Sequence, residues 1–121
     1  MPISRILVVD DSPTERFFLS DLLVKNGYMV SLAESGEEAV AQARQTLPDL
    51  IVMDVVMPGM NGYQATRVIS REEATRHIPI ILCTSKGQET DKVWGMRQGA
   101  RAYLVKPVDP RELLSQIRAL G

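Results

Sequence analysis

Short, strongly apolar runs alternate along the chain with stretches in which apolar residues recur at helical spacing. The apolar runs predict strands over residues 5–10, 28–33, 50–54, 80–84 and 102–105. Between and after these runs, helices are expected to begin after Ser12, Ser35 and Asp109, and to cover residues 62–73 and 89–98. Strands that alternate with helices in this way predict an α/β protein.

The composition of the strands predicts how they pair. Most of the runs are apolar throughout, as in parallel strands that are covered on both faces, whereas 28–33 alternates as an edge strand does. Repeated strand–helix units imply a doubly wound parallel sheet with helices on both faces. With the second strand at an edge, the flavodoxin-like order 2-1-3-4-5 fits best. The length of 121 residues suits a single domain over residues 1–121.

The helix starts carry capping signals. Ser12 and Glu15 predict a capping box at the start of the first helix. Two further boxes are expected at Ser35-Gly36-Glu37-Glu38 and at Asp109-Pro110-Arg111-Glu112. Leu47 is expected to point inward at the end of the second helix.

Composition narrows the class of function. The chain has 14 Lys+Arg against 15 Asp+Glu, a net charge of -1, which argues against a nucleic acid partner. The single Cys83 cannot form an internal disulfide and lies in an apolar run, so we expect an inert thiol and a cytoplasmic protein. No apolar stretch is long enough for membrane insertion, and no signal peptide is expected before the first strand.

Polar side chains stand where the predicted strands end. Asp10 and Asp11 end the first strand, Asp54 the third, Thr84 the fourth, and Lys106 follows the fifth. In the expected order these ends lie at the edge where open parallel sheets bind ligands. Burying a charged side chain at the end of a strand costs free energy, so its presence there indicates a role in binding or chemistry. We therefore expect one site for a divalent cation and a phosphoryl group.

The acidic residues suit Mg²⁺, which prefers carboxylates, retained water and phosphate oxygens. Asp10, Asp11 and Asp54 are predicted to hold the ion, with the Val56 backbone carbonyl as an added metal ligand. Asp54 is also the candidate nucleophile, because a carboxylate can carry a phosphoryl group.

The ammonium of Lys106 and the hydroxyl of Thr84 would contact the phosphoryl oxygens. Each residue also has a plainer interpretation when it is taken alone. Asp11 could serve only the dipole of the first helix, Thr84 is a common strand-end hydroxyl, and Lys106 is a common solvated cation. Their combination at one edge of the sheet favours the site for a cation and a phosphoryl group over these plainer interpretations. His77, in a polar stretch away from this edge, is not expected to take part.

These residues together resemble the receiver domains of two-component response regulators over essentially the whole chain. Thr84 follows Asp54 by 30 positions and Lys106 follows it by 52, as in that family. The motifs that carry the resemblance are Asp10-Asp11, Asp54-Val55-Val56-Met57-Pro58 with Gly62 beyond it, Thr84-Ser85 and Lys106-Pro107.

The resemblance implies that Asp54 accepts a phosphoryl group from a histidine kinase, with Mg²⁺ as the cofactor. Lys106 would bind the phosphate, and the Lys106–Pro107 peptide would be cis. Thr84 would move toward the acyl phosphate and Tyr103 would change rotamer with it. The residues alone favour a plainer role for Tyr103, as an edge-strand aromatic with its hydroxyl in water.

The family also implies an output by protein binding. The switch would alter the face made by the fourth helix, the fifth strand and the fifth helix. The chain looks like a stand-alone receiver, a monomer or weak dimer, and is not expected to be an enzyme beyond its own phosphorylation and dephosphorylation. Similarity to receivers of chemotaxis-like systems that control type IV pilus twitching motility indicates a downstream motility protein as partner. The segments that carry this similarity are Ser12-Pro13-Thr14-Glu15, Gly62–Arg67 and Gln88–Ala100.

One departure bears on the lifetime of the phosphoryl group. In this family the side chains at positions 56 and 86 flank the path of hydrolytic water. Val56 cannot orient a water molecule, so we expect slow loss of the phosphoryl group.

Other functions stay open at this point. A phosphate sink for the kinase would use the same residues. A phosphatase of the haloacid dehalogenase type usually carries a second Asp two residues after the nucleophile, where this chain has Val56. A flavodoxin-like electron carrier would need a Ser/Thr/Gly-rich loop after the first strand, where Asp10-Asp11 would repel the flavin phosphate.

Overall fold

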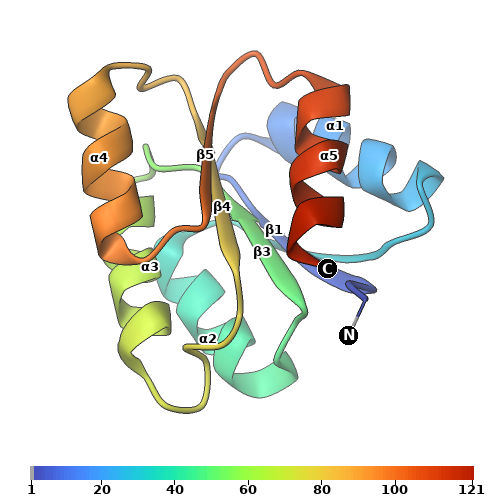
Figure 1. Ribbon diagram of the computed structural model, residues 1–121. Helices are drawn as coiled ribbons and strands as arrows, with labels where there is room; N and C mark the ends of the chain where they lie inside the picture. The colour runs from blue at the N-terminus through green and yellow to red at the C-terminus, as the bar shows by residue number, and fades with distance from the viewer. Residues whose placement is uncertain (1) are drawn as a thin grey trace.

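The computed structural model describes residues 2–121, and in it a parallel sheet lies between two layers of helices (Figure 1). The strands are β1 (Arg5–Val9), β2 (Met29–Ala33), β3 (Leu50–Met53), β4 (Ile80–Thr84) and β5 (Ala102–Val105). The helices are α1 (Pro13–Lys25), α2 (Gly36–Thr46), α3 (Gly62–Arg71), α4 (Glu89–Gln98) and α5 (Pro110–Leu120). The strand order is β2-β1-β3-β4-β5, which confirms the predicted flavodoxin-like topology.

Each face of the sheet has its own core. Leu7 and Val9 of β1 pack with residues of α2 and α3, whereas Ile6 and Val8 pack with residues of α1 and α5. Because successive side chains of a strand point to opposite faces, a strand with helices on both faces must be apolar at every position. The central strands β3 and β4 are buried throughout for this reason, whereas β2 at the edge is mostly exposed and only Ala33 in it is fully buried.

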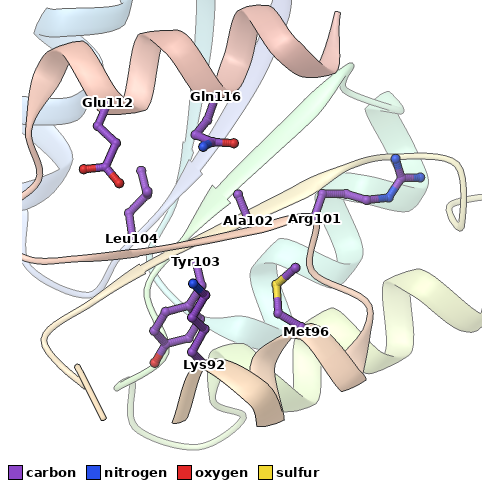
Figure 2. Close-up of a pocket in the computed structure, with 8 residues that line it drawn as sticks. All are labelled: Lys92, Met96, Arg101, Ala102, Tyr103, Leu104, Glu112 and Gln116. Atoms are coloured by element: carbon purple, nitrogen blue, oxygen red, sulfur yellow. The ribbon is translucent and has the colours of Figure 1, made fainter. Parts of the chain in front are cut away.

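The side chains of β5, at the other edge of the sheet, point alternately to its two faces. Figure 2 shows Ala102 and Leu104 pointing toward α5, while Tyr103 lies on the α4 side. Tyr103 belongs to the α2–α3 core and its side chain is buried. This contradicts the plainer interpretation of Tyr103 as an edge-strand aromatic with its hydroxyl in water.

The predicted N-caps are present, but the capping boxes are elsewhere. Ser12 and Ser35 accept hydrogen bonds from the amides of Glu15 and Glu38, at 3.4 and 3.1 Å, as N-caps do. The Glu38 carboxylate accepts instead from the Glu34 amide at 3.2 Å, and Asp109 caps the amide of Arg111 rather than that of Glu112. A reciprocal box occurs at Asn61 with Gln64, and at the start of α4 the Asp91 carboxylate accepts from the Gln88 amide at 3.2 Å.

Two helix ends also differ from the sequence prediction. Leu47 follows α2 with a φ of 46°, and this left-handed backbone turns its side chain outward, so 43% of it is exposed. The prediction that Leu47 points inward was wrong. α3 ends at Arg71, two residues before the predicted end, because Glu72 has extended backbone.

Within residues 2–121, no helix combines the length and the apolar character that crossing a membrane requires. Cys83 lies buried in β4, and burial raises the pKa of its thiol to about 12. The thiolate is therefore suppressed at neutral pH, as expected of an inert cysteine.

Candidate functional site

The pairing of β1 with β3 brings two acids together. Val9 lies opposite Met53 in the parallel register, and the Asp54 amide donates to the Val9 carbonyl at 2.9 Å. Asp10 and Asp54 therefore leave neighbouring strands at the same level. Both carboxylates are buried, with 1% and 8% of the residue exposed.

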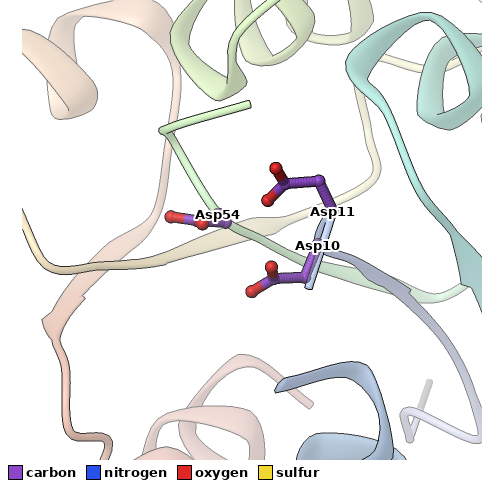
Figure 3. Close-up of side chains that lie close together, drawn as sticks. All are labelled: Asp10, Asp11 and Asp54. Carbon is purple, nitrogen blue, oxygen red and sulfur yellow. The ribbon is translucent and has the colours of Figure 1, made fainter. Parts of the chain in front are cut away.

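Asp11 completes an acidic cluster with these two residues. One carboxylate oxygen from each of Asp10, Asp11 and Asp54 lies within 4.8 Å of the others, and Asp11 is exposed at the rim (Figure 3). Three hard oxygen donors at this separation fit the preference of Mg²⁺ for carboxylates together with retained water. The residues present thus fit the ion that the sequence predicts.

The two oxygens of Asp54 have different surroundings. Oδ1 accepts hydrogen bonds from the amides of Val55 at 2.7 Å and Val56 at 3.4 Å. Oδ2 faces Lys106, whose Nζ lies 3.5 Å away. Burial raises the pKa of the Asp54 carboxyl, and the charge of Asp10 adds to this, although Lys106 and the amides oppose it.

Lys106 enters the site from the loop after β5. Its Nζ donates to Asp10 Oδ2 at 2.8 Å and lies 3.9 Å from Glu15 Oε2. Burial disfavours the ammonium, but the hydrogen bond to Asp10 and the charge of Asp54 outweigh it and hold the pKa of Lys106 above its usual value. Lys106 therefore stays cationic among the acids. The Lys106–Pro107 peptide is cis.

Thr84 and Tyr103 are linked to the site through Lys86 and Lys106. Thr84 ends β4, is fully buried, and its Oγ1 accepts from the Lys86 amide at 3.3 Å. Its carbonyl accepts from the Lys106 amide at 2.9 Å, so the two residues are joined by the backbone. The Tyr103 hydroxyl donates to the Lys86 carbonyl at 2.7 Å.

Three residues that contact the site or its neighbours were missed by the sequence analysis. Glu15 was assigned to a capping box, but its carboxylate lies near Lys106 instead. Arg16 donates to the Asp10 carbonyl oxygen at 2.6 Å and pairs with Glu34 at 3.0 Å. Tyr63 lies 3.3 Å from Tyr103, hydroxyl to hydroxyl. The proximity of Glu15 and Arg16 to the acidic pair in the sequence was a usable signal, whereas Tyr63 carried none.

His77 lies far from the acidic cluster. It lines a cavity with Asp49 and Pro79, which precede β3 and β4 at the opposite edge of the sheet. Its position agrees with the expectation that it takes no part in the site.

Comparison with known proteins gives the family. The response regulator receiver domain matches residues 6–118. Protein PilH of Pseudomonas aeruginosa is 56% identical over 118 residues, which make up 98% of each chain. The chain therefore belongs to the response regulator receiver domain family of two-component signalling, and the resemblance stated from its motifs is confirmed.

Solved structures agree with this assignment. The chemotaxis protein CheY4 of Vibrio cholerae has a TM-score of 0.91 at 33% identity, covering 98% of this chain and 99% of its own. The receiver domain of sensor histidine kinase PA1611 from Pseudomonas aeruginosa, with a magnesium ion coordinated in its active site cleft, has a TM-score of 0.89 at 33% identity. That match covers 97% of this chain and 96% of the receiver. The chain spans 51% of the length of the transcriptional regulator PhoB of Escherichia coli.

Proposed function

We propose that Asp54 accepts a phosphoryl group from a histidine kinase and that this modification switches protein binding at the face formed by α4, β5 and α5. The observation that carries the proposal is the arrangement of three carboxylates within 4.8 Å of one another, with the Lys106 ammonium 3.5 Å from Asp54 Oδ2. A cation site and a fixed ammonium on either side of one carboxylate are what phosphoryl transfer to that carboxylate requires.

Asp10, Asp11 and Asp54 would hold Mg²⁺, together with the Val56 carbonyl. When bound, the ion would neutralise charge on the transferred phosphoryl group. The receiver of PA1611, which carries magnesium in its active site cleft, supports this assignment by similarity.

Asp54 would attack the phosphorus of the kinase phosphohistidine through one carboxylate oxygen. The new O–P bond forms as the P–N bond breaks, and the electron pair of that bond returns to the imidazole, which takes up a proton from solvent. Oδ1 is engaged by two backbone amides, so we assign the attack to Oδ2, which faces Lys106. Lys106 would then stabilise the charge gathering on the phosphoryl oxygens.

The modification would change the charge that Thr84 and Lys106 experience. A phosphoryl group carries about -1.5 to -2 charges where the carboxylate carried one, and it adds acceptors. Thr84 would turn toward it, and because Thr84 and Tyr103 are both tied to Lys86, the movement would reach Tyr103. Tyr103 lines the cavity between α4 and α5, so its orientation would be read at that face.

The downstream partner would belong to a motility system. Support comes from the identity with PilH over 98% of both chains and from the fold shared with the chemotaxis protein CheY4. We place the protein in the cytoplasm, where a histidine kinase presents its phosphohistidine.

Acetyl phosphate with Mg²⁺ tests the proposal without the kinase. Intact-protein mass spectrometry should show one added phosphoryl group on the wild type and none on Asp54→Ala. Asp21→Ala is the matched control, because Asp21 lies on the exposed side of α1 paired with Lys25. Equal labelling of Asp54→Ala, or no labelling of the wild type, would refute the proposal.

A further inference from the structure

The hydroxyls of Tyr63 and Tyr103 form a hydrogen-bond network that reaches Lys86, the residue tied to Thr84. The Tyr103 hydroxyl donates to the Lys86 carbonyl oxygen at 2.7 Å. The Tyr63 hydroxyl lies 3.3 Å from that of Tyr103 and 3.1 Å from the Asp91 carbonyl oxygen. Tyr63 on α3 is thereby joined to Tyr103 on β5, 40 positions away, and to the first turn of α4.

Counting hydrogens shows what each tyrosine supplies. Each hydroxyl has one hydrogen, so two hydrogens must serve three contacts. The Tyr103 hydroxyl donates its hydrogen to the Lys86 carbonyl oxygen. The hydrogen of Tyr63 therefore serves the Asp91 carbonyl and the Tyr103 oxygen in turn. Burial raises the pKa of Tyr103, and Tyr63 adds to this, so the Tyr103 phenol stays protonated and able to donate.

The helix α4 leaves room for the Tyr103 ring at one residue. A methyl group on Gly95 would lie 2.9 Å from Cδ2 and 3.0 Å from Cε2 of Tyr103, and 3.1 Å from Leu82 Cδ1. The first of these contacts is shorter than real Cβ atoms make, and the other two are tighter than nearly all that occur. The inward ring is therefore packed against bare helix backbone and depends on the glycine.

With Tyr103 inward, a cavity of about 240 Å³ lies open between α4 and α5 (Figure 2). Side chains of both helices and of the edge strand surround it, among them Lys92, Met96, Arg101, Glu112 and Gln116. Tyr103 lines this cavity on the α4 side. Rotation of Tyr103 about its Cα–Cβ bond toward solvent would carry the ring into the cavity.

We propose that Tyr63 is a positioning residue that holds Tyr103 inward before Asp54 is phosphorylated, and that it thereby keeps the α4–α5 cavity open in the resting protein. This inference rests on the proposed function, because the cavity lies in the face through which the switch would act. Tyr63 belongs to α3, so it sets the resting position of Tyr103 without contacting the acidic cluster.

Removing the Tyr63 hydroxyl has a predictable size. It takes one neutral hydrogen bond from the inward state and leaves the Tyr103 bond to Lys86 intact. The ratio of outward to inward Tyr103 should therefore rise about fivefold in Tyr63→Phe.

Fluorine NMR of unphosphorylated protein labelled with 3-fluorotyrosine measures this ratio. The Tyr103 resonance is assigned with Tyr103→Phe, and its shift between H₂O and D₂O reports exposure. Gly95→Ala, which leaves no room for the inward ring, supplies the outward reference. Tyr28→Phe is the matched control, because Tyr28 packs against the other core, on the α1–α5 side.

The expected result is an inward wild type, an inward Tyr28→Phe and a population shift in Tyr63→Phe. An unchanged ratio in Tyr63→Phe would overturn the inference. If that variant does not fold, Tyr63→Leu also removes the hydroxyl and must give the same shift. The ratio is measured before any phosphodonor is added, so it is judged separately from the mass assay for Asp54 phosphorylation.

Discussion

The ammonium nitrogen of Lys106 lies 2.8 Å from Oδ2 of Asp10, although 96 positions separate the two residues in the sequence. The contact runs along the carboxyl ends of the strands, from the end of β1 to the loop after β5. Asp10 Oδ1 accepts from the Ser12 amide at 2.9 Å, so both oxygens of this buried acid have donors. The Lys106 ammonium thus occupies the side of the acidic cluster that a phosphoryl group would approach.

Lys106→Ala should tighten Mg²⁺ binding about tenfold, because it removes a positive charge that repels the ion from a few Å away and frees an oxygen of Asp10. Isothermal titration calorimetry measures the dissociation constant. Lys25→Ala is the control, since Lys25 pairs only with exposed Asp21 among the ion pairs of residues 2–121. Weaker binding in Lys106→Ala would show that Lys106 orders the acids rather than competing with the metal.

Val56→Asn should shorten the lifetime of the Asp54 phosphoryl group about tenfold, because an amide can orient the attacking water and the apolar side chain cannot. The rate is followed as loss of the phosphoryl mass after removal of acetyl phosphate, with Mg²⁺ present. Val24→Asn is a matched control, because Val24 and Val56 are both 55% exposed. Equal decay of Val56→Asn and wild type would contradict the expectation.

Asp54→Asn should stabilise the metal-free protein at pH 7 by about 1 kcal/mol, or a few degrees in Tm. Burial raises the pKa of Asp54 in the folded protein above its unfolded value. The favourable contribution of the protonated carboxyl is therefore complete below the unfolded pKa and is lost as pH rises through the folded pKa.

The advantage of Asp54→Asn should accordingly shrink as the pH falls toward about 4, near the ordinary pKa of an aspartate. Thermal unfolding in EDTA at several pH values checks this dependence. Asp21→Asn, on the exposed surface of α1, should show no such trend. A variant less stable than wild type at pH 7 would mean that Lys106 compensates the Asp54 charge fully.

Gly62→Ala should lower stability by about 2 kcal/mol or more and abolish phosphorylation. A methyl group at Gly62 would lie 2.2 Å from the Asp54 carbonyl oxygen and 2.8 Å from Val55 Cα, and backbone atoms cannot yield as a flexible side chain can. Denaturant unfolding and the mass assay measure the two effects. Gly87→Ala is the control, since its nearest neighbour is the Val105 side chain at 3.1 Å.

The strand order was predictable from the sequence because a strand that is buried on both faces must be composed of apolar residues. β3 and β4 are covered on both faces and are apolar at every position except Thr84 at the end of β4, while β2 at the edge is largely exposed. Once the order is known, the meeting of Asp10 with Asp54 follows from the parallel register, and no side-chain detail is needed.

Side-chain partners were less predictable, because they depend on competitors from distant segments. Glu15 has the spacing of a capping box, yet Lys106, from the far end of the chain, lies near its carboxylate. The inward orientation of Tyr103 depends on the absence of a side chain at Gly95 and on the hydroxyl of Tyr63. An edge strand alone permits either orientation, so no local pattern could decide between them.

The register of β1 against β3 has a consequence for folding. A shift of β3 by one residue would put Val55 where Asp54 lies and turn its apolar side chains to the opposite faces. The acidic cluster therefore exists only when these two strands align correctly. Magnesium, if it binds only the native pairing, would stabilise the correctly aligned fold over the misaligned one by mass action.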